Sequence, residues 1–177
     1  MRLIILDRDG VINQDSDSYV KTVDEWLPIP GSIEAMARLC HAGYRIAVAT
    51  NQSGLSRGLF TIDDLNAMHR KMHRELATHG AHVDAVFFCP HGPDAGCACR
   101  KPNPGLLEEI SSRMQVDLVG VPCVGDSYRD IAAANAMGAI PILVRTGKGE
   151  RTMLEHRPEL LGTVVYADLA AVAESLV

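Results

Sequence analysis

The stretch RLIILDRDG, residues 2–10, is an apolar run that ends in two aspartates and a glycine. An apolar run of this length between polar residues is typical of a buried β-strand. Because side chains at i and i+2 point the same way along an extended backbone, Asp7 and Asp9 should lie on one side. Gly10 next to them permits a sharp turn. The stretch therefore predicts a strand that carries two carboxylates at its end.

Similar apolar runs recur along the chain, and we predict further strands at 44–50, 84–89, 121–126 and 140–144, with a weaker edge strand at 163–167. Helical patterns separate or follow these runs, at 31–43, 62–79, 104–115, 128–137 and 168–176. Strands that alternate with helices predict an α/β, Rossmann-like three-layer sandwich with a central parallel sheet. Residues 11–30 are expected to form a loop or flap, and no insertion is long enough for a separate cap domain.

Length and charge narrow the class of protein. The 177 residues fit a single domain over 1–177, and the formal net charge of -5 leaves no basic face for nucleic acid. No apolar run approaches the roughly 20 residues of a membrane span, so we expect no membrane contact. The N-terminus has no signal-peptide pattern. We therefore expect a cytoplasmic monomer that acts on a small molecule.

Polar side chains stand where the predicted strands end, namely Asp7, Thr50, Cys89 and Asp126. Ligands of parallel α/β sheets bind beyond the carboxyl ends of the strands, so this convergence predicts an active site. The two carboxylates of Asp7 and Asp9 need a cation, and Mg²⁺ is the natural one for oxygen ligands. Asp126 would supply a further carboxylate, with Asp130 one helical turn on. The alternative, that these acids only cap a turn and a helix, is disfavoured for the whole ordered set.

A second cluster lies in the loop CPHGPDAGCAC, residues 89–99. Its residues Cys89, His91, Cys97 and Cys99 are the ligand set of a closed tetrahedral zinc site. Four protein ligands leave no position for a catalytic water, so we predict that the zinc is structural. It would fold a loop that has almost no apolar residues of its own. The ion would thereby fix Arg100 and Lys101, which follow directly.

Four motifs in order carry a resemblance to a known family: LDRDG at 6–10, ATNQSG at 49–54, Lys101, and VGDSYRD at 124–130. They resemble the haloacid dehalogenase-like phosphatases over nearly the whole chain. The resemblance implies that Asp7 is the nucleophile that forms an aspartyl-phosphate and that Asp9 is the general acid and base. It implies that Thr50 and Lys101 hold the phosphoryl oxygens. It also implies Mg²⁺ ligands, which would be Asp7, the backbone carbonyl of Asp9, and Asp126.

The zinc loop, followed by Arg-Lys-Pro, resembles a small capless branch shared by heptose bisphosphate phosphatases and histidinol phosphate phosphatases. TNQSGLSRG at 50–58 and RKPNPG at 100–105 favour the former. This implies removal of the 7-phosphate of a D-glycero-D-manno-heptose 1,7-bisphosphate, in synthesis of nucleotide-activated heptose for the lipopolysaccharide core. The short zinc loop keeps histidinol phosphate as the alternative substrate. A zinc-stabilised binding module without catalysis is a third, disfavoured hypothesis, and the sugar anomer stays open.

Candidate substrate contacts surround this centre, and they are Asp15, Ser16, Tyr19, Asn51, Gln52, Ser53, Arg100 and Lys101. The planar guanidinium of Arg100 would suit the phosphate that is not cleaved. Arg57 is either another phosphate contact or a solvated loop charge. His69 and His73, four residues apart in HRKMH, lack the Glu of a metalloprotease site, so we predict a solvated helix face. Gly147 to Gly149 resemble a phosphate-binding loop too weakly to predict nucleotide binding.

Overall fold

The computed structural model describes residues 2–177, and their middle layer is a six-stranded sheet in the order β3-β2-β1-β4-β5-β6. All neighbouring strands pair in parallel. The strands are β1 (Arg2–Leu6), β2 (Tyr44–Asn51), β3 (Ala85–Cys89), β4 (Pro122–Gly125), β5 (Ile140–Val144) and β6 (Val164–Tyr166). The predicted strands and the parallel sheet are confirmed.

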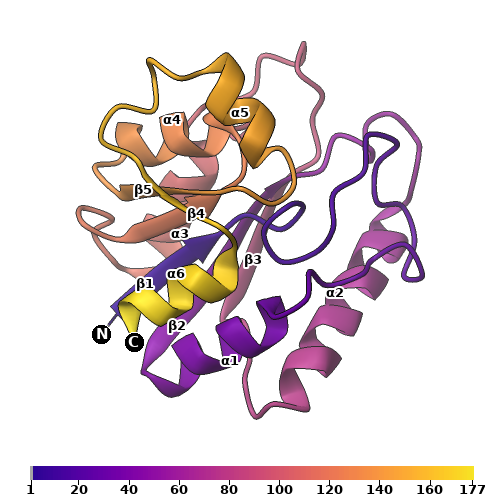
Figure 1. Cartoon of the computed structure of the whole chain (residues 1–177). Helices are drawn as coiled ribbons and strands as arrows, with labels where there is room; N and C mark the ends of the chain where they lie inside the picture. The colour runs from indigo at the N-terminus through magenta and orange to yellow at the C-terminus, as the bar shows by residue number, and fades with distance from the viewer. Residues whose placement is uncertain (1) are drawn as a thin grey trace.

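Helices cover both faces of this sheet (Figure 1). One face packs against α1 (Ser32–His41), α2 (Ile62–Ala77) and α6 (Leu169–Leu176), and the other against α3 (Gly105–Met114) and α4 (Tyr128–Ala136). A further helix, α5 (Gly149–Glu155), follows β5 and was not predicted from the sequence. It offers few apolar residues, and Leu154 among them is exposed, so no helical stripe marks it.

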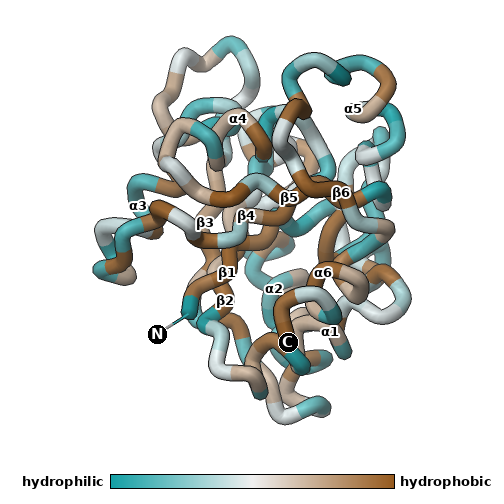
Figure 2. Tube along the Cα trace, turned by 60° about the vertical axis from the view of Figure 1, so that its left-hand side comes forward, coloured by the Kyte–Doolittle hydropathy of each residue, from teal (hydrophilic) through white to brown (hydrophobic). Residues whose placement is uncertain are grey.

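The strand residues form the two halves of the core, and Figure 2 shows that the hydrophobic stretches gather in the strands. Ile4 and Leu6 of β1 pack with α1, α2 and α6, whereas Leu3 and Ile5 pack with α3 and α4. Because alternate side chains point to opposite faces and both faces are covered, a central strand is apolar throughout. This is why β1 is an unbroken apolar run.

The strand order reverses between β1 and β4, which lie side by side. In open parallel sheets this switch point opens a crevice at the carboxyl ends of the strands. The chain from 7 to 31 leaves β1 there, and 90–104 leaves β3. Neither segment contains a helix or a strand, so the described residues hold no cap domain. Among residues 2–177, no helix has both the length and the apolar character needed to span a membrane.

Candidate active site

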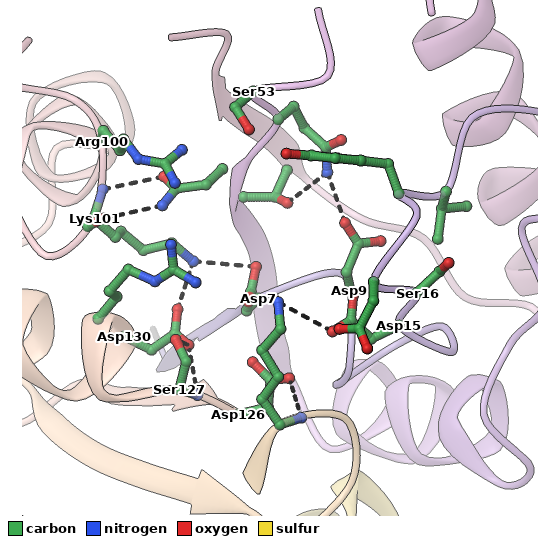
Figure 3. A pocket seen from close by; sticks show the side chains of 18 of the residues that line it. Asp7, Asp9, Asp15, Ser16, Ser53, Arg100, Lys101, Asp126, Ser127 and Asp130 are labelled. Carbon is green, nitrogen blue, oxygen red and sulfur yellow. Dashed lines mark hydrogen bonds and ion pairs between the residues drawn. The ribbon is translucent and has the colours of Figure 1, made fainter. Parts of the chain in front are cut away.

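Lys101 is a buried cation between two carboxylates (Figure 3). Its Nζ lies 3.1 Å from Asp7 Oδ1 and 2.6 Å from Asp130 Oδ1, and it donates to the Ala49 carbonyl at 2.6 Å. Burial alone would lower the pKa of Lys101, but the charges of Asp130 and Asp7 outweigh it and raise the pKa. Lys101 is therefore a fixed ammonium beside Asp7.

Asp130 holds Lys101 from the first turn of α4. Its Oδ2 accepts hydrogen bonds from the Ser127 backbone N–H at 3.0 Å and from the Ser127 hydroxyl at 2.8 Å, which forms a capping box. The sequence predicts Asp130 near the metal, but not its pairing with Lys101. The Ser-x-x-Asp spacing of the capping box was the available signal for its position, although not for its partner.

Asp7 lies at the end of β1, with Lys101 and Asp9 on either side of it in the pocket. Its Oδ1 accepts a hydrogen bond from the Arg8 backbone N–H at 2.7 Å and faces Lys101. Its Oδ2 has no hydrogen-bond partner in the described part of the chain. Burial raises the pKa of Asp7 to about 7; the Lys101 charge opposes this rise, and Asp130 and Asp9 add to it.

Asp126 follows β4 and is held from two sides. Its Oδ2 accepts the Lys148 backbone N–H at 2.8 Å, and its own carbonyl accepts the Thr152 hydroxyl at 3.1 Å. Gly10 has a φ of 85°, and a Cβ there would collide with the Asp126 carboxylate, so this close approach requires glycine. Burial, and then repulsion from Asp7 and Asp130, raise the pKa of Asp126 to about 8.

The three carboxylates of Asp7, Asp126 and Asp130 place ligand oxygens within 4.8 Å of one another. Lys101 supplies a single positive charge to them, so negative charge is in excess. Because Asp130 is engaged by Lys101 and Ser127, the carboxylates free to bind a cation are those of Asp7 and Asp126. Oxygen ligands with excess negative charge are what Mg²⁺ prefers, and the residues present fit that ion.

Both carboxylate oxygens of Asp9 accept hydrogen bonds. Its Oδ1 accepts hydrogen bonds from Arg8 Nε at 3.0 Å, Arg8 Nη2 at 2.8 Å and Asn13 Nδ2 at 2.8 Å. Its Oδ2 accepts Gln52 Nε2 at 3.0 Å. Burial would raise the pKa of Asp9, but the Arg8 charge and these hydrogen bonds outweigh it and hold the pKa below its usual range. Neither Arg8 nor Asn13 was singled out from the sequence.

His69 is buried, contrary to the sequence prediction of a solvated face, whereas His73 is exposed as predicted. His69 Nε2 lies 3.2 Å from Arg8 Nη1. Burial and the Arg8 charge lower the pKa of His69 to about 3, so the ring is neutral. The prediction was wrong because the i, i+4 spacing shows only that two side chains lie near one face, and the edge of that face is covered by the loop after β1.

The segment after β2 connects the site residues to one another. Gln52 Nε2 bridges Asp9 Oδ2 and Thr50 Oγ1, the latter at 2.9 Å. The Asn51 side chain exchanges two hydrogen bonds with the Lys101 backbone, at 3.0 and 3.1 Å. Asn51 and Ser53 both line the pocket. The amide of Asn51 thus fixes Lys101, and contact of these residues with substrate stays a prediction.

The flap predicted at 11–30 lies over the pocket through Asp15, Ser16 and Tyr19. Asp15 Oδ2 forms an ion pair with Lys148 Nζ at 3.2 Å, which links the flap to the start of α5. The Arg57 guanidinium lies over the Tyr19 ring, 5.8 Å from its centre. Arg57 is exposed and does not line the pocket, which agrees with the alternative of a solvated loop charge and not with a phosphate contact.

The four predicted zinc ligands come together beside this pocket. Their ligand atoms lie within 4.8 Å of one another, with Cys89 Sγ 3.7 Å from Cys97 Sγ and 3.5 Å from His91 Nδ1. Cys89 is buried at the end of β3, and the other three ligands come from the loop. Three sulfurs and one imidazole nitrogen converging in this way fit a closed tetrahedral Zn²⁺ site.

Arg100 leaves the zinc loop toward the pocket, where it lines the wall with Arg129. Its Nη1 donates to the His91 carbonyl at 3.2 Å. Burial, and then the nearby Arg129 charge, lower the pKa of Arg100, which indicates that the two guanidinium groups are close. The pocket thus pairs an anionic centre around Asp7 with a cationic wall. Arg129 and Lys148 of this wall were not predicted from the sequence.

Two family models match this chain. The HAD-hydrolase-like model matches residues 98–172, and the polynucleotide kinase 3 phosphatase model matches residues 2–134.

Named relatives match the chain over its whole length. The D-glycero-beta-D-manno-heptose-1,7-bisphosphate 7-phosphatase of Bordetella bronchiseptica is 60% identical over 99% of this chain and 98% of the relative. The enzyme of the same name from Pseudomonas putida is 54% identical over 100% of both chains. Both names are those of phosphatases acting on a heptose bisphosphate.

Solved structures match as well. The D,D-heptose 1,7-bisphosphate phosphatase of B. bronchiseptica, solved with magnesium and phosphate, superimposes with a TM-score of 0.94 at 58% identity, covering 99% of this chain and 98% of that chain. The corresponding structure from Burkholderia thailandensis gives a TM-score of 0.76 at 45% identity, with the same coverage.

Proposed function

Because the chain belongs to the haloacid dehalogenase-like phosphatases, and within them to the heptose bisphosphate phosphatase family, we propose that it removes the 7-phosphate of D-glycero-D-manno-heptose 1,7-bisphosphate. The chain is a phosphatase. The observation that carries the proposal is the meeting of Asp7, Lys101 and Asp126 in one pocket whose wall holds Arg100. The relatives at 54% and 60% identity do not favour histidinol phosphate or a non-catalytic module.

In the first chemical step, Asp7 would attack phosphorus. Oδ2 is the oxygen we assign to the attack, since Oδ1 is held by the Arg8 N–H and faces Lys101. The Lys101 ammonium and the Thr50 hydroxyl would contact the phosphoryl oxygens and stabilise the charge that develops on them. An aspartyl-phosphate on Asp7, which is a mixed anhydride, and a free sugar hydroxyl are the products of this step.

Asp9 would serve both steps as the proton carrier. In the first it would protonate the leaving sugar oxygen, and in the second it would remove a proton from the water that hydrolyses the aspartyl-phosphate. Its side chain lines the pocket beside Asp7. Asp7, Asp126 and the Asp9 backbone carbonyl would hold Mg²⁺, which offsets the repulsion between an anionic nucleophile and a phosphate ester.

The substrate contacts follow from the lining of the pocket. Arg100 would bind the 1-phosphate that is retained, while Asp15, Ser16 and Tyr19 of the flap would face sugar hydroxyls. The other substrate contacts would be at the phosphate that is cleaved, and they would come from Asn51, Gln52 and Ser53. We further propose that residues 1–177 act as one domain and one monomer in the cytoplasm, in nucleotide-activated heptose synthesis for lipopolysaccharide. The heptose bisphosphate in the relatives' name supports the place in heptose synthesis.

The direct test is kcat/KM with Mg²⁺ for both anomers of the heptose 1,7-bisphosphate, beside histidinol phosphate. We expect one heptose anomer to be the preferred substrate, because the retained phosphate meets a cationic wall that histidinol phosphate cannot use. Preference for histidinol phosphate would overturn the proposed substrate while keeping the phosphatase chemistry.

Arg100→Ala is the matched variant for this experiment. Its loss of kcat/KM should be larger for the bisphosphate than for a heptose 7-monophosphate, since only the bisphosphate carries the second anion. Equal losses on the two esters would contradict the role of Arg100.

The zinc site would affect catalysis only by fixing the positions of Arg100 and Lys101. Arg100 and Lys101 directly follow the ligand Cys99, so a folded loop sets where both cations lie. The loop has few apolar side chains, and metal binding to such a segment contributes directly to its folding.

Removal of zinc is expected to lower kcat/KM by about 10²-fold, the typical effect of displacing substrate-binding groups by an ångström or so. The protein is treated with a chelator and Mg²⁺ is then restored, so that only zinc is missing. Far-UV circular dichroism should keep the signal of the sheet and helices. Cys97→Ser should reproduce the effect, and Cys40→Ser, a cysteine outside the loop, should keep zinc. Full activity in protein shown to be free of zinc would refute the prediction.

A further inference from the structure

Arg8 is a fully buried arginine between the two catalytic aspartates in sequence. Its side chain does not line the pocket, so it does not touch the substrate. A buried guanidinium requires hydrogen-bond acceptors for its nitrogens. Nε and Nη2 both donate to Asp9 Oδ1, at 3.0 and 2.8 Å, and Nη1 lies 3.2 Å from His69 Nε2.

His69 is the acceptor for the third nitrogen of Arg8. Because a guanidinium can only donate, His69 Nε2 must accept, and the ring then carries its hydrogen on Nδ1. His69 comes from α2 and is 8% exposed. The series of hydrogen bonds from Asp9 through Arg8 to His69 therefore leads from the active site into the interior, away from the pocket.

The two oxygens of Asp9 are held unequally. Oδ1 accepts three donors, two from Arg8 and one from Asn13 Nδ2 at 2.8 Å, which exceeds its two lone pairs. Oδ2 accepts one, from Gln52 Nε2 at 3.0 Å. Only Oδ2 has a lone pair left for a proton.

We propose that Arg8 and His69 are positioning residues that lock Asp9 Oδ1, so that Oδ2 alone delivers the proton to the leaving oxygen. This rests on the proposed role of Asp9 as the acid. The Arg8 charge keeps Asp9 a carboxylate in the empty pocket, so Oδ2 takes up its proton together with the anionic substrate, whose charge opposes that of Arg8. As the phosphorus–oxygen bond to the sugar breaks and the phosphoryl group passes to Asp7, this proton moves to the leaving oxygen and Asp9 becomes a carboxylate again. Arg8 then neutralises that carboxylate, and His69 keeps the guanidinium in its plane.

The leaving group distinguishes this role from a merely structural one. A sugar alkoxide leaves poorly without a proton, whereas p-nitrophenolate leaves without one. The value of kcat/KM reports only steps up to the first irreversible one, which is transfer of the phosphoryl group to Asp7. A disturbed Asp9 should therefore lower kcat/KM for the sugar ester and spare the aryl ester.

The test is His69→Leu, which removes the acceptor of Arg8 Nη1. General acids contribute about 10² to 10⁴-fold, so we expect kcat/KM for heptose 1,7-bisphosphate to fall about 10²-fold and that for p-nitrophenyl phosphate by no more than about threefold. His73→Leu, an exposed histidine one turn further along α2, is the matched control and should keep both values. Equal losses on both esters, or no loss, would overturn the proposal.

Two further variants decide the matter even if His69→Leu does not fold. In His69→Gln the amide oxygen can replace Nε2 as the acceptor, whereas in His69→Asn it corresponds to Nδ1 and falls short of Arg8. Gln should restore the sugar-ester activity and Asn should not, and identical values for the two would overturn the proposal. If the wild type does not hydrolyse heptose bisphosphate, the proposed substrate is wrong. An alkyl phosphate that the enzyme does hydrolyse is then compared with p-nitrophenyl phosphate instead.

Discussion

Asp7→Asn is expected to lower kcat on heptose 1,7-bisphosphate by on the order of 10⁴- to 10⁶-fold, as the loss of an enzyme nucleophile does. Asparagine places a non-nucleophilic amide nitrogen where Asp7 has Oδ2, the oxygen that we assign to the attack and that has no hydrogen-bond partner among residues 2–177. The other groups stay in place, because asparagine keeps the shape of the side chain and can still accept the Arg8 N–H at Oδ1. Steady-state rates with saturating Mg²⁺ measure the effect.

The variant should remain folded. Asp7→Asn removes one of three carboxylates whose oxygens lie within 4.8 Å, so the repulsion inside the pocket falls. In the absence of divalent cations its melting temperature should therefore equal or exceed that of the wild type. Asp24→Asn, which changes an exposed aspartate outside the pocket, is the control and should keep full activity. A residual kcat above about one hundredth of wild type would refute the role of Asp7 as nucleophile.

Most of the fold could be predicted because each buried parallel strand is marked by one short run of consecutive apolar residues. The run RLIIL is apolar at consecutive positions since Leu3 and Ile4 face opposite cores, and the same holds for β2 and β4. Helix α5 could not be predicted, because tertiary contacts hold it. The Thr152 hydroxyl donates to the Asp126 carbonyl, and the ring of His156, just after α5, stacks on Tyr128 at 4.6 Å.

The site residues, too, could be predicted only in part. The metal-binding and catalytic carboxylates stand at strand ends, and the sheet order then brings them together. Asp9 is paired with its neighbour Arg8, but most of the other contacts that hold the charged groups come from distant segments. Arg8 meets His69 across 61 positions, Lys101 meets Asp130 across 29, and the Lys148 amide meets Asp126 across 22. Helical spacing predicts the same exposure for His69 and His73. Only the packing of the folded chain shows that His69 is buried and His73 is exposed.

Lys101→Met is expected to lower kcat/KM by about 10²- to 10³-fold, the loss found when one preorganised donor to a transition-state oxyanion is removed. It should also reduce the free energy of unfolding by about 3–5 kcal/mol, because it leaves buried carboxylates without their counter-ion. Methionine fills the volume of the lysine stem, so the loss reports charge rather than a cavity. Urea unfolding and steady-state kinetics measure the two quantities.

A second variant separates the two effects. Asp130→Asn combined with Lys101→Met removes the nearer unpaired carboxylate, whose oxygen lies 2.6 Å from Nζ in the wild type. Stability should then recover in part, while activity stays low because no ammonium remains to contact the phosphoryl group. Lys101→Arg should not restore activity either, since the Asp7, Asp130 and Ala49 oxygens are arranged around a compact ammonium, not a planar fork. Activity that recovered together with stability in the double variant would show that Lys101 only supports the fold, and that the phosphoryl oxygens are held by Thr50 and the metal.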